Sequence, residues 1–185
     1  MLVVIAGPSG VGKGSIVRQL LARDPKLWFS VSLNTRPPRP GEVDGVDYWF
    51  VDRTEFERLR DAGGLLEWFQ VYDDLKGTPR GPVEDHLAAG DDVILELDVQ
   101  GARAIREVYP DAVLIFVKPP SRAVQRERLF ARDPHVDPKV LERRLDEAEA
   151  EERQAGDFDA VVVNDDLSRA VDEVAAILQA RRETS

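Results

Sequence analysis

The strongest constraint on the fold is the stretch of residues 7–15, Gly-Pro-Ser-Gly-Val-Gly-Lys-Gly-Ser, which directly follows the apolar run Leu2–Ala6. Five apolar residues bounded by glycine predict a buried strand, and residues 15–21 predict an amphipathic helix. A strand, then Gly-x-x-x-x-Gly-Lys, then a helix is the pattern of a phosphate-binding loop. The alternative is an ordinary glycine-rich turn with a solvated Lys13. The correct order of all three parts favours the phosphate loop.

The residues of this loop suit an anion for physical reasons. Glycines reach positive φ, so that successive backbone N–H groups can face inward, and the helix start adds unpaired N–H groups and the positive end of its dipole. Lys13 adds a movable positive charge for the outer phosphates. Gly14 stands where a Ser or Thr commonly meets Mg²⁺, so we assign that role to the next hydroxyl, Ser15. The predicted phosphate-binding residues are Gly7, Pro8, Ser9, Gly10, Val11, Gly12, Lys13, Gly14 and Ser15.

Length and composition limit the remaining possibilities. A chain of 185 residues suits one compact domain with a sizeable core, and the absence of cysteine excludes disulfides and thiolate metal sites. A formal net charge of −10 argues against general nucleic-acid binding. No apolar run approaches a membrane span, and Met1 is followed at once by the first strand, without a signal peptide. We therefore expect a cytoplasmic protein that is a monomer or a small homo-oligomer.

The segment Asn34 to Glu42 is too rich in proline for a helix or a central strand. Its prolines keep the backbone extended and reduce its freedom. Such stiffening is useful if Arg36 and Arg39 converge on one anion, because less entropy is lost on binding. A solvated Pro-Arg loop is the alternative, but the nearby phosphate loop favours the binding interpretation.

The rest of the chain alternates strands and helices. We expect strands over 27–33, 48–51, 65–72, 92–97, 112–118 and 158–163, helices over 53–62, 82–89, 122–132, 138–154 and 167–182, and a loop over 73–79. This alternation predicts an α/β three-layer sandwich around a five-stranded, mostly parallel sheet. Glu96 and Asp98 point to the same side near the carboxyl end of strand 92–97, where such sheets bind ligands. Helix caps or turn residues are the alternative for that pair.

Two segments depart from the alternation. Residues 34–80 are strand-rich and look antiparallel, so we expect an inserted lobe there; within it Glu67 lies among bulky apolar residues, where an unpaired carboxylate is costly. Residues 122–132 hold four arginines and one acid, and with the following helix they suggest a hinged lid at about 122–155, although such charge runs are by default a solvated face. The core would then comprise 1–33, 81–121 and 156–185.

The chain resembles the guanylate kinase family along its whole length. The matching stretches are G-P-S-G-V-G-K-G-S at 7–15, S-V-S-L-N-T-R-P-P-R-P-G-E at 30–42, D-Y-W-F at 47–50, L-E-W at 66–68, G-T-P at 77–79, I-L-E-L-D-V-Q-G at 94–101, R-L-x-x-R at 128–132 and V-V-N-D-D at 162–166. The resemblance implies transfer of the γ-phosphoryl group of ATP, with Mg²⁺, to GMP or dGMP, giving ADP and GDP in purine nucleotide metabolism. It also implies a GMP-binding lobe and a mobile lid.

The same resemblance implies roles for individual residues. The GMP phosphate would be held by Arg36, Arg39 and Tyr48. Guanine would be held by Ser32, Glu67, Thr78 and Asp98. The ATP phosphates would be covered by the catalytic arginines Arg128, Arg132 and Arg144, acting with Lys13, and adenine would meet Asn164.

The chemistry of guanine agrees with a role for Glu67. Guanine presents N1–H and an amino group as adjacent donors that one carboxylate can accept, whereas adenine presents a bare N1 acceptor. A site whose buried polar groups stay unpaired can reject the wrong base by several powers of ten.

The chain departs from the family pattern at two positions. Lys76 replaces the tyrosine of the usual Asn-x-Tyr-Gly-[ST] loop, and it either contacts the GMP phosphate as a point charge or is solvated. Glu96 stands where an Asp is common, so the family role near the metal falls to a longer carboxylate.

Three other functions compete with this interpretation. A kinase for another monophosphate, such as AMP, is opposed by Glu67 and Asp98. A non-catalytic guanylate-kinase-like scaffold is opposed by the retention of Lys13 and of the five arginines of the two phosphate sites. A hydrolytic P-loop enzyme would not need the acceptor lobe.

Overall fold

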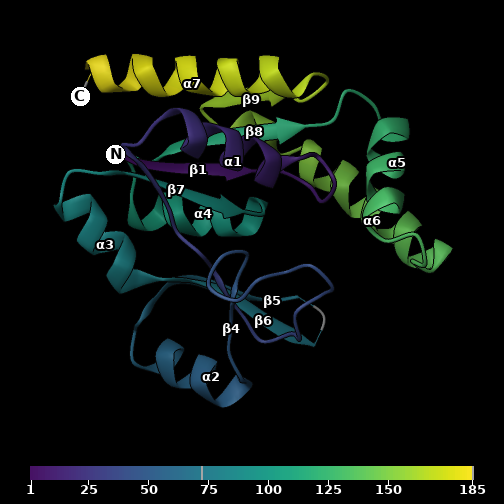
Figure 1. Ribbon diagram of the computed structural model, residues 1–185, viewed down its shortest axis with the longest axis horizontal. Coiled ribbons are helices and arrows are strands. Elements are labelled where there is room, and N and C mark those ends of the chain that lie inside the picture. The colour runs from purple at the N-terminus through teal and green to yellow at the C-terminus, as the bar shows by residue number, and fades with distance from the viewer. Residues whose placement is uncertain (72, 185) are drawn as a thin grey trace.

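The strand β1 (Leu2–Ala6) is central to a five-stranded sheet in the computed structural model, which describes residues 1–71 and 73–184 (Figure 1). The strand order is β2-β7-β1-β8-β9, and every neighbouring pair is parallel. The other strands are β2 (Leu27–Phe29), β7 (Asp92–Leu97), β8 (Val113–Lys118) and β9 (Ala160–Val163). The predicted parallel sheet is therefore confirmed.

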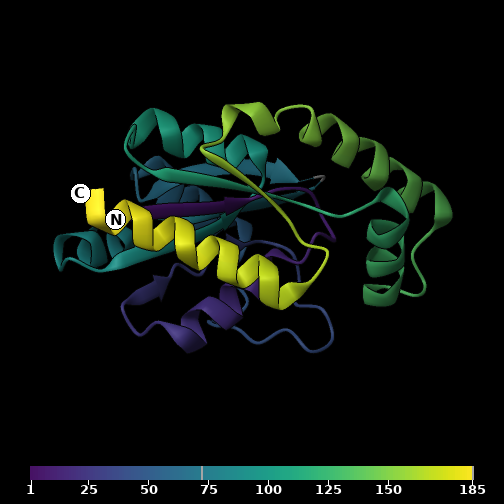
Figure 2. The same cartoon turned by 90° about the horizontal axis from the view of Figure 1, so that it is seen from above.

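Helices cover both faces of this sheet, because β1 is apolar on both sides. Val3 and Ile5 pack toward α1 (Lys13–Arg23) and α7 (Leu167–Thr184), which lie together on one face (Figures 1 and 2). The alternate residues of β1 pack toward α3 (Arg80–Ala88) and α4 (Val99–Val108) on the other face. The three-layer arrangement is confirmed. It anchors the phosphate loop between two core elements, the central strand β1 and the helix α1.

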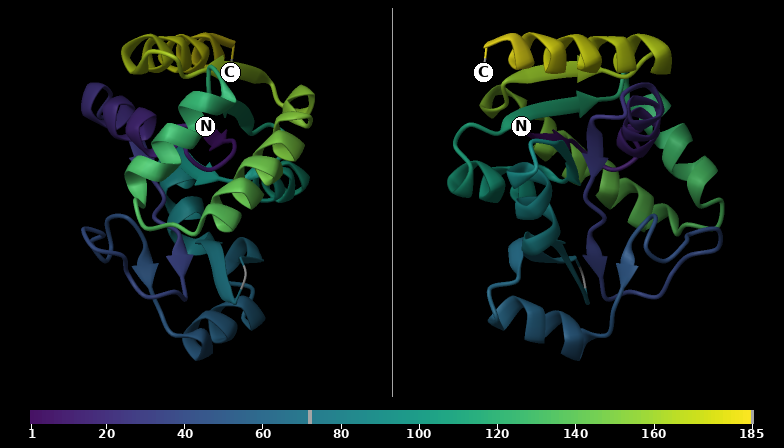
Figure 3. Two further views of the ribbon diagram at one scale, coloured as in Figure 1. Left: turned by 90° about the vertical axis from the view of Figure 1, so that its right-hand side faces the viewer. Right: turned by 60° about the vertical axis from the view of Figure 1, so that its left-hand side comes forward.

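A second sheet of four strands lies below the first (Figure 3), in the order β4-β3-β6-β5. Its elements are β3 (Leu33–Asn34), β4 (Trp49–Phe50), α2 (Arg53–Asp61), β5 (Leu65–Val71) and β6 (Asp74–Pro79). The β3–β6 and β5–β6 pairs are antiparallel, whereas β3 and β4 are parallel. The fully buried Phe56 of α2 supplies this lobe with its own small core.

Two of the predicted elements are wrong. Residues 27–33 do not form one strand: β2 pairs with β7, but the chain leaves the core sheet after Ser30, whose N–H donates to Ile94 O at 3.0 Å. Leu33 then pairs with Gly77 in the second sheet. The apolar pattern runs through both halves, so it hides the change of partner.

The predicted loop over 73–79 is instead the strand β6. Gly77 disfavours a strand by propensity, but here it lets the backbone approach closely, since a Cβ would lie 2.9 Å from Glu67 O. Tyr72, the last residue of the predicted strand 65–72, lies outside the described residues.

The helices α5 (Arg122–Arg132) and α6 (Pro138–Glu152), followed by the 3₁₀ turn η1 (Ala155–Asp157), stand beside the carboxyl ends of the core strands (Figures 1 and 3). Ser121 caps α5, where its side chain accepts from Val124 N. Leu129, Leu141 and Leu145 pack between the two helices, which therefore form one unit.

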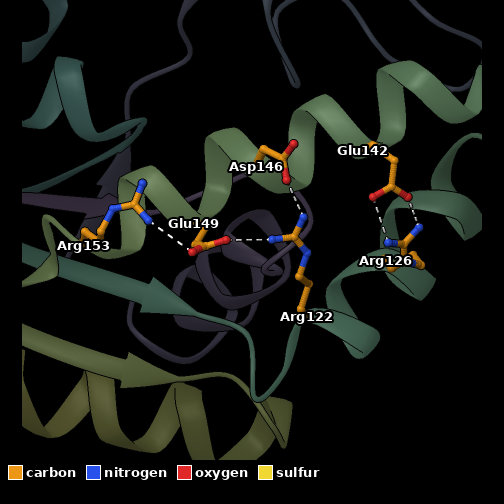
Figure 4. Close-up of polar contacts among 6 residues, drawn as sticks. All are labelled: Arg122, Arg126, Glu142, Asp146, Glu149 and Arg153. Atoms are coloured by element: carbon orange, nitrogen blue, oxygen red, sulfur yellow. Dashed lines mark hydrogen bonds and ion pairs between the residues drawn. The ribbon is translucent and has the colours of Figure 1, made fainter.

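The outer face of this unit carries ion pairs between the two helices (Figure 4). Arg122 binds Asp146 at 2.6 Å and Glu149 at 2.9 Å, and Arg126 pairs with Glu142. Such exposed pairs contribute little to stability individually, but they use two of the four arginines of α5. The other two, Arg128 and Arg132, lie on the side of α5 that carries the buried residues Gln125 and Leu129.

No helix among residues 1–71 and 73–184 is both long enough and apolar enough to span a membrane.

Candidate functional site

The phosphate loop between β1 and α1 depends on glycine backbone geometry. Gly7, Gly10 and Gly12 have φ of 139°, 81° and 93°. A Cβ on Gly7 would lie 2.1 Å from Val117 O, so no other residue fits against β8 there. Gly12 is the N-cap of α1, and the helix starts at Lys13, two residues earlier than the sequence predicted. The first N–H groups of α1 therefore point into the loop.

The side chain of Lys13 links the two ends of the loop by hydrogen bonds. Its ammonium donates to Gly7 O at 2.6 Å and to Pro8 O at 3.0 Å. Burial lowers the pKa of Lys13, an effect opposed by three nearby carboxylates, those of Glu96, Glu151 and Asp98. Because an ammonium has three N–H donors, one donor of Lys13 remains for a ligand.

The outer side of the loop is held by side chains from α5 and from the end of β9. Gln125 Nε2 donates to Ser9 O at 2.8 Å, and Arg128 donates to Val11 O at 3.2 Å and to Asn164 O at 3.0 Å. Asn164 Nδ2 also donates to Val11 O, at 2.7 Å. Asn164 Oδ1 is buried and has no partner among the described residues. It can accept from an amino group such as that of adenine.

Two oxygen-bearing side chains flank the start of α1. The carboxylate of Glu96 lies beside Gly14, where a Cβ would be 3.3 Å from Glu96 Oε2. Ser15 Oγ lies on the same helical turn and accepts from Arg18 at 3.2 Å. Hydroxyl and carboxylate oxygens suit Mg²⁺, which commonly takes one or two protein ligands together with substrate phosphates. The described residues hold no cluster of three or more His, Cys, Asp or Glu.

Glu67 is the central buried acid of the second sheet. It is 5% exposed, and its Oε1 accepts from the hydroxyl of Thr78 at 2.5 Å. Its Oε2 is buried without a partner in the described part of the chain. Burial raises the pKa of Glu67 to about 7, against the opposing effects of Thr78 and Lys76. A Cβ on Gly101 would lie 3.3 Å from Oε2, so glycine at the start of α4 keeps room beside this carboxylate.

The Pro-Arg segment is organised by an acid that it contains. Arg36 makes a bidentate ion pair with Glu42, at 2.7 and 2.6 Å, and the backbone N–H of Arg39 donates to the same carboxylate at 2.7 Å. The hydrogen bonds from Arg36 to Glu42 raise the pKa of Arg36. The guanidinium of Arg36 also lies 5.2 Å from the centroid of the Tyr48 ring. Glu42 thus fixes the direction of Arg36, a role that the sequence analysis did not assign.

Lys76 lies inside the site rather than in solvent. Its ammonium is 5.4 Å from the centroid of the Tyr48 ring. Burial alone would lower the pKa of Lys76, yet the pKa is raised by the surrounding groups, which are Tyr48, Glu96, Asp98 and Glu67. Lys76 therefore stands between the second sheet and the carboxyl end of β7.

The positive charges of arginines from two separate segments act on Arg39. Partial desolvation, and after it the positive charges of Arg132, Arg36 and Arg144, lower the pKa of Arg39. Arg132 and Arg144 come from α5 and α6, about a hundred residues away in sequence. Mutual repulsion of this kind is relieved by an anion.

The remaining predicted residues have less specific surroundings. Ser32 is buried just before β3. Asp98 is the N-cap of α4, and its Oδ1 accepts from Gly101 N at 2.8 Å. The helix-cap alternative therefore holds for Asp98, although its charge also faces Lys13 and Lys76.

Three side chains of the site escaped the sequence analysis. Glu42 and Gln125 make the contacts described above, and Glu151 of α6 faces Lys13. Glu151 follows Arg144 by seven residues, a spacing that puts both on one side of a helix and could have identified it.

The phosphate loop follows the central strand of a parallel sheet, and a second site that contains several arginines lies opposite it. This arrangement defines a phosphotransferase of the P-loop class. Comparison with known proteins narrows the class. The family model described as guanylate kinase matches residues 1–181. The chain therefore belongs to the guanylate kinase family.

Individual relatives agree. The chain is 54% identical over 182 residues to a guanylate kinase of Symbiobacterium thermophilum, covering 98% of this chain and 86% of the relative. It is 50% identical over 184 residues to a guanylate kinase of Thermus thermophilus, covering 100% of this chain and 82% of the relative. A crystal structure of guanylate kinase from Anaplasma phagocytophilum superposes with a TM-score of 0.82 at 34% identity, covering 98% of this chain and 85% of that one.

Proposed function

We propose that this protein transfers the γ-phosphoryl group of ATP to GMP, giving ADP and GDP. The observation that carries the proposal is Glu67, whose Oε1 is satisfied by Thr78 and whose buried Oε2 has no partner in the described residues. The paired N1–H and amino donors of guanine satisfy such a carboxylate. Adenine would leave it facing the lone pair of N1, and a buried polar group left unpaired is strongly disfavoured.

ATP would occupy the phosphate loop. The backbone N–H groups at the start of α1 and the remaining donor of Lys13 would bind its β- and γ-phosphates, as the geometry of the loop supports. Asn164 Oδ1 would accept from the amino group of adenine. Arg128, which now binds backbone carbonyls beside the loop, lies close enough to join the phosphates after a change of rotamer.

The phosphate of GMP would lie among Arg36, Arg39, Tyr48 and Lys76. Arg36 is held in direction by Glu42, so little side-chain freedom is lost when it binds. Guanine would be held by Glu67, Thr78, Ser32 and Asp98. The convergence of Arg132 and Arg144 on Arg39 supports a position for the transferred phosphoryl group between the lid and the lobe.

In the reaction, an oxygen of the GMP phosphate would attack the γ-phosphorus of ATP. The new P–O bond forms as the bond to the leaving ADP oxygen breaks, so no proton needs to be removed from the attacking group. We assign no general base. The protein acts by aligning the two phosphates and by neutralising charge with Lys13 and the lid arginines. A lid that covers both substrates would also exclude water and limit hydrolysis of ATP.

Mg²⁺ fits beside the loop, where Ser15 and Glu96 would hold it. When bound, it would neutralise part of the phosphate charge.

We also propose a division of the chain into a core (1–33, 81–121 and 156–185), a GMP-binding lobe (34–80) and a lid (122–155). The second sheet and the α5–α6 unit support it, although Leu33 already belongs to β3. The enzyme would work in the cytoplasm in purine nucleotide metabolism, as a monomer or a small homo-oligomer, and would accept dGMP more weakly than GMP.

The test is an ADP-release assay with ATP and each of GMP, dGMP, AMP, UMP and CMP. We expect rapid turnover with GMP, slower turnover with dGMP and little with the others. Turnover with AMP and none with GMP would overturn the assignment of the base. No ADP release with any acceptor, from a protein that binds GMP, would instead support the non-catalytic scaffold.

A further inference from the structure

Glu151 is a partly buried acid to which the proposed reaction gives no role. It lies in the last turn of α6, and Arg144, Ala148 and Glu151 follow one another at helical spacings of four and three residues. Ala148 is 2% exposed, so this side of α6 is turned inward. The two charged residues of this side are therefore directed toward the core, in contrast to the ion-paired outer face of Figure 4.

The surroundings of Glu151 identify the group that it faces. Its Oε2 is buried and has no hydrogen-bond partner among residues 1–71 and 73–184. The charges around it are Lys13 of α1, which attracts it, and Asp98 before α4 and Glu147 of α6, which repel it. Burial, more than these charges, raises the pKa of Glu151 to about 7. Lys13 is thus the cation among the charged groups that act on this carboxylate.

Lys13 cannot serve every anion at once. Two of its N–H donors are used by Gly7 O and Pro8 O, and the third is the donor that the ATP phosphates require. A carboxylate facing the same ammonium stabilises it while the loop is empty and repels the phosphates when they arrive.

We propose that Glu151 is an intramolecular competitor of the ATP phosphates for Lys13, and that it thereby sets how tightly the phosphate loop holds its nucleotide. The inference rests on the proposed function only in that the loop binds ATP. Glu151 acts through Lys13 and does not take part in phosphoryl transfer. Because it is carried on α6 with Arg144, the lid that supplies a cation to the transferred phosphate also supplies an anion that limits the affinity of the donor site.

The experiment measures the Kd of Mg²⁺-bound β,γ-imido-ATP by titration calorimetry, without an acceptor, for the wild type and for Glu151→Gln. The variant keeps the shape of the side chain and removes its charge, so it should bind the nucleotide roughly three- to tenfold more tightly at pH 8. The matched control is Glu149→Gln on the outer face of α6, where Glu149 binds Arg122 and Arg153; its Kd should equal that of the wild type.

The pH profile separates charge from structure. Glu151 is largely protonated at pH 6 and largely ionised at pH 8, so the ratio of wild-type to Glu151→Gln Kd should be near one at pH 6 and should rise toward pH 8. This ratio cancels the titration of the nucleotide itself. Glu151→Asp moves the charge away from Lys13 by one methylene. The affinity of this variant for the nucleotide should therefore lie between those of the wild type and Glu151→Gln. It replaces Glu151→Gln in the experiment if that variant does not fold.

An unchanged or weaker affinity in the variants at pH 8, or a ratio independent of pH, would overturn the inference. Failure of the wild type to bind the nucleotide at all would overturn the proposed function instead.

Discussion

The two ends of the proposed site would hold their ligands by different means. At the phosphate loop the structure depends mainly on backbone: three glycines at positive φ, the start of α1, and a lysine bonded to two carbonyls. In the lobe, by contrast, the proposed recognition would depend on side chains: Glu67, whose Oε2 has no hydrogen-bond partner in the described residues, Arg36 fixed by Glu42, and Lys76 beside Tyr48.

This difference explains the division of labour. Backbone N–H groups bind any phosphate and cannot distinguish one base from another. A buried carboxylate can, because the wrong base leaves its oxygen unpaired. The loop is built into the core sheet, whereas the proposed selectivity would be carried by Glu67 on β5 of the smaller second sheet. Chemistry and choice of substrate should therefore be separable by mutation.

The largest effect should come from Lys13→Met, which removes the ammonium that bonds to Gly7 O and Pro8 O inside the phosphate loop. We expect kcat to fall by about a thousandfold or more, since charge stabilisation of the transition state is lost. The Kd for GMP, measured by calorimetry, should change by less than about twofold, because the lobe is intact. Lys26→Met, at an exposed position, is the control. An equal loss of GMP affinity would break the proposed separation of the two ends.

The second largest effect should come from Glu67→Gln. An amide can accept from N1–H of guanine but can also donate to N1 of adenine, so kcat/KM for GMP should fall by about a hundredfold and the preference over AMP should shrink. The KM for ATP should not change. Glu57→Gln, on the exposed side of α2, is the control. Full retention of GMP selectivity would show that another group chooses the base.

A smaller effect is expected for Lys76→Met. Removal of one cation beside Tyr48 should raise the KM for GMP by about tenfold, leave kcat within about threefold, and weaken the dependence of this KM on salt. Lys76→Tyr, which restores the residue usual in the family, should recover part of the loss. If the KM for GMP is unchanged at low salt, Lys76 only neutralises the charge of the surrounding carboxylates and does not bind the GMP phosphate.

Much of the fold could be predicted from the sequence because the core elements carry strong local signals. β1 is a continuous apolar run, β7 and β8 are nearly so, and Ser121 marks the start of α5. The failures lie where pairing decides the structure. Residues 27–33 have one pattern but two partner sheets, and β6 contains a glycine and a proline that local propensity would assign to a loop.

The site shows the same limit. Motifs gave the candidate phosphate-binding residues, but not the contacts of Glu42 with Arg36 or of Gln125 with Ser9 O. Those contacts join segments whose approach depends on the folded chain. Glu67 Oε2 and Asn164 Oδ1 have no hydrogen-bond partner in the described residues because of how the chain packs around them. No spacing in the sequence reveals this.

The central claim, that Glu67 chooses guanine through an ionised carboxylate, is tested most directly by the pH dependence of selectivity. Burial raises the pKa of Glu67 to about 7, so the carboxylate is mainly protonated at pH 6 and mainly ionised at pH 8. The protonated form can donate to N1 of adenine, whereas the ionised form accepts both donors of guanine.

The measurement is the Kd of GMP and of AMP at both pH values, with AMP controlling for titration of the substrate phosphate. The ratio of the AMP Kd to the GMP Kd should rise by up to about tenfold from pH 6 to pH 8 in the wild type, and should stay constant in Glu67→Gln. A wild-type ratio that stays constant, or that falls as the pH rises, would contradict the account.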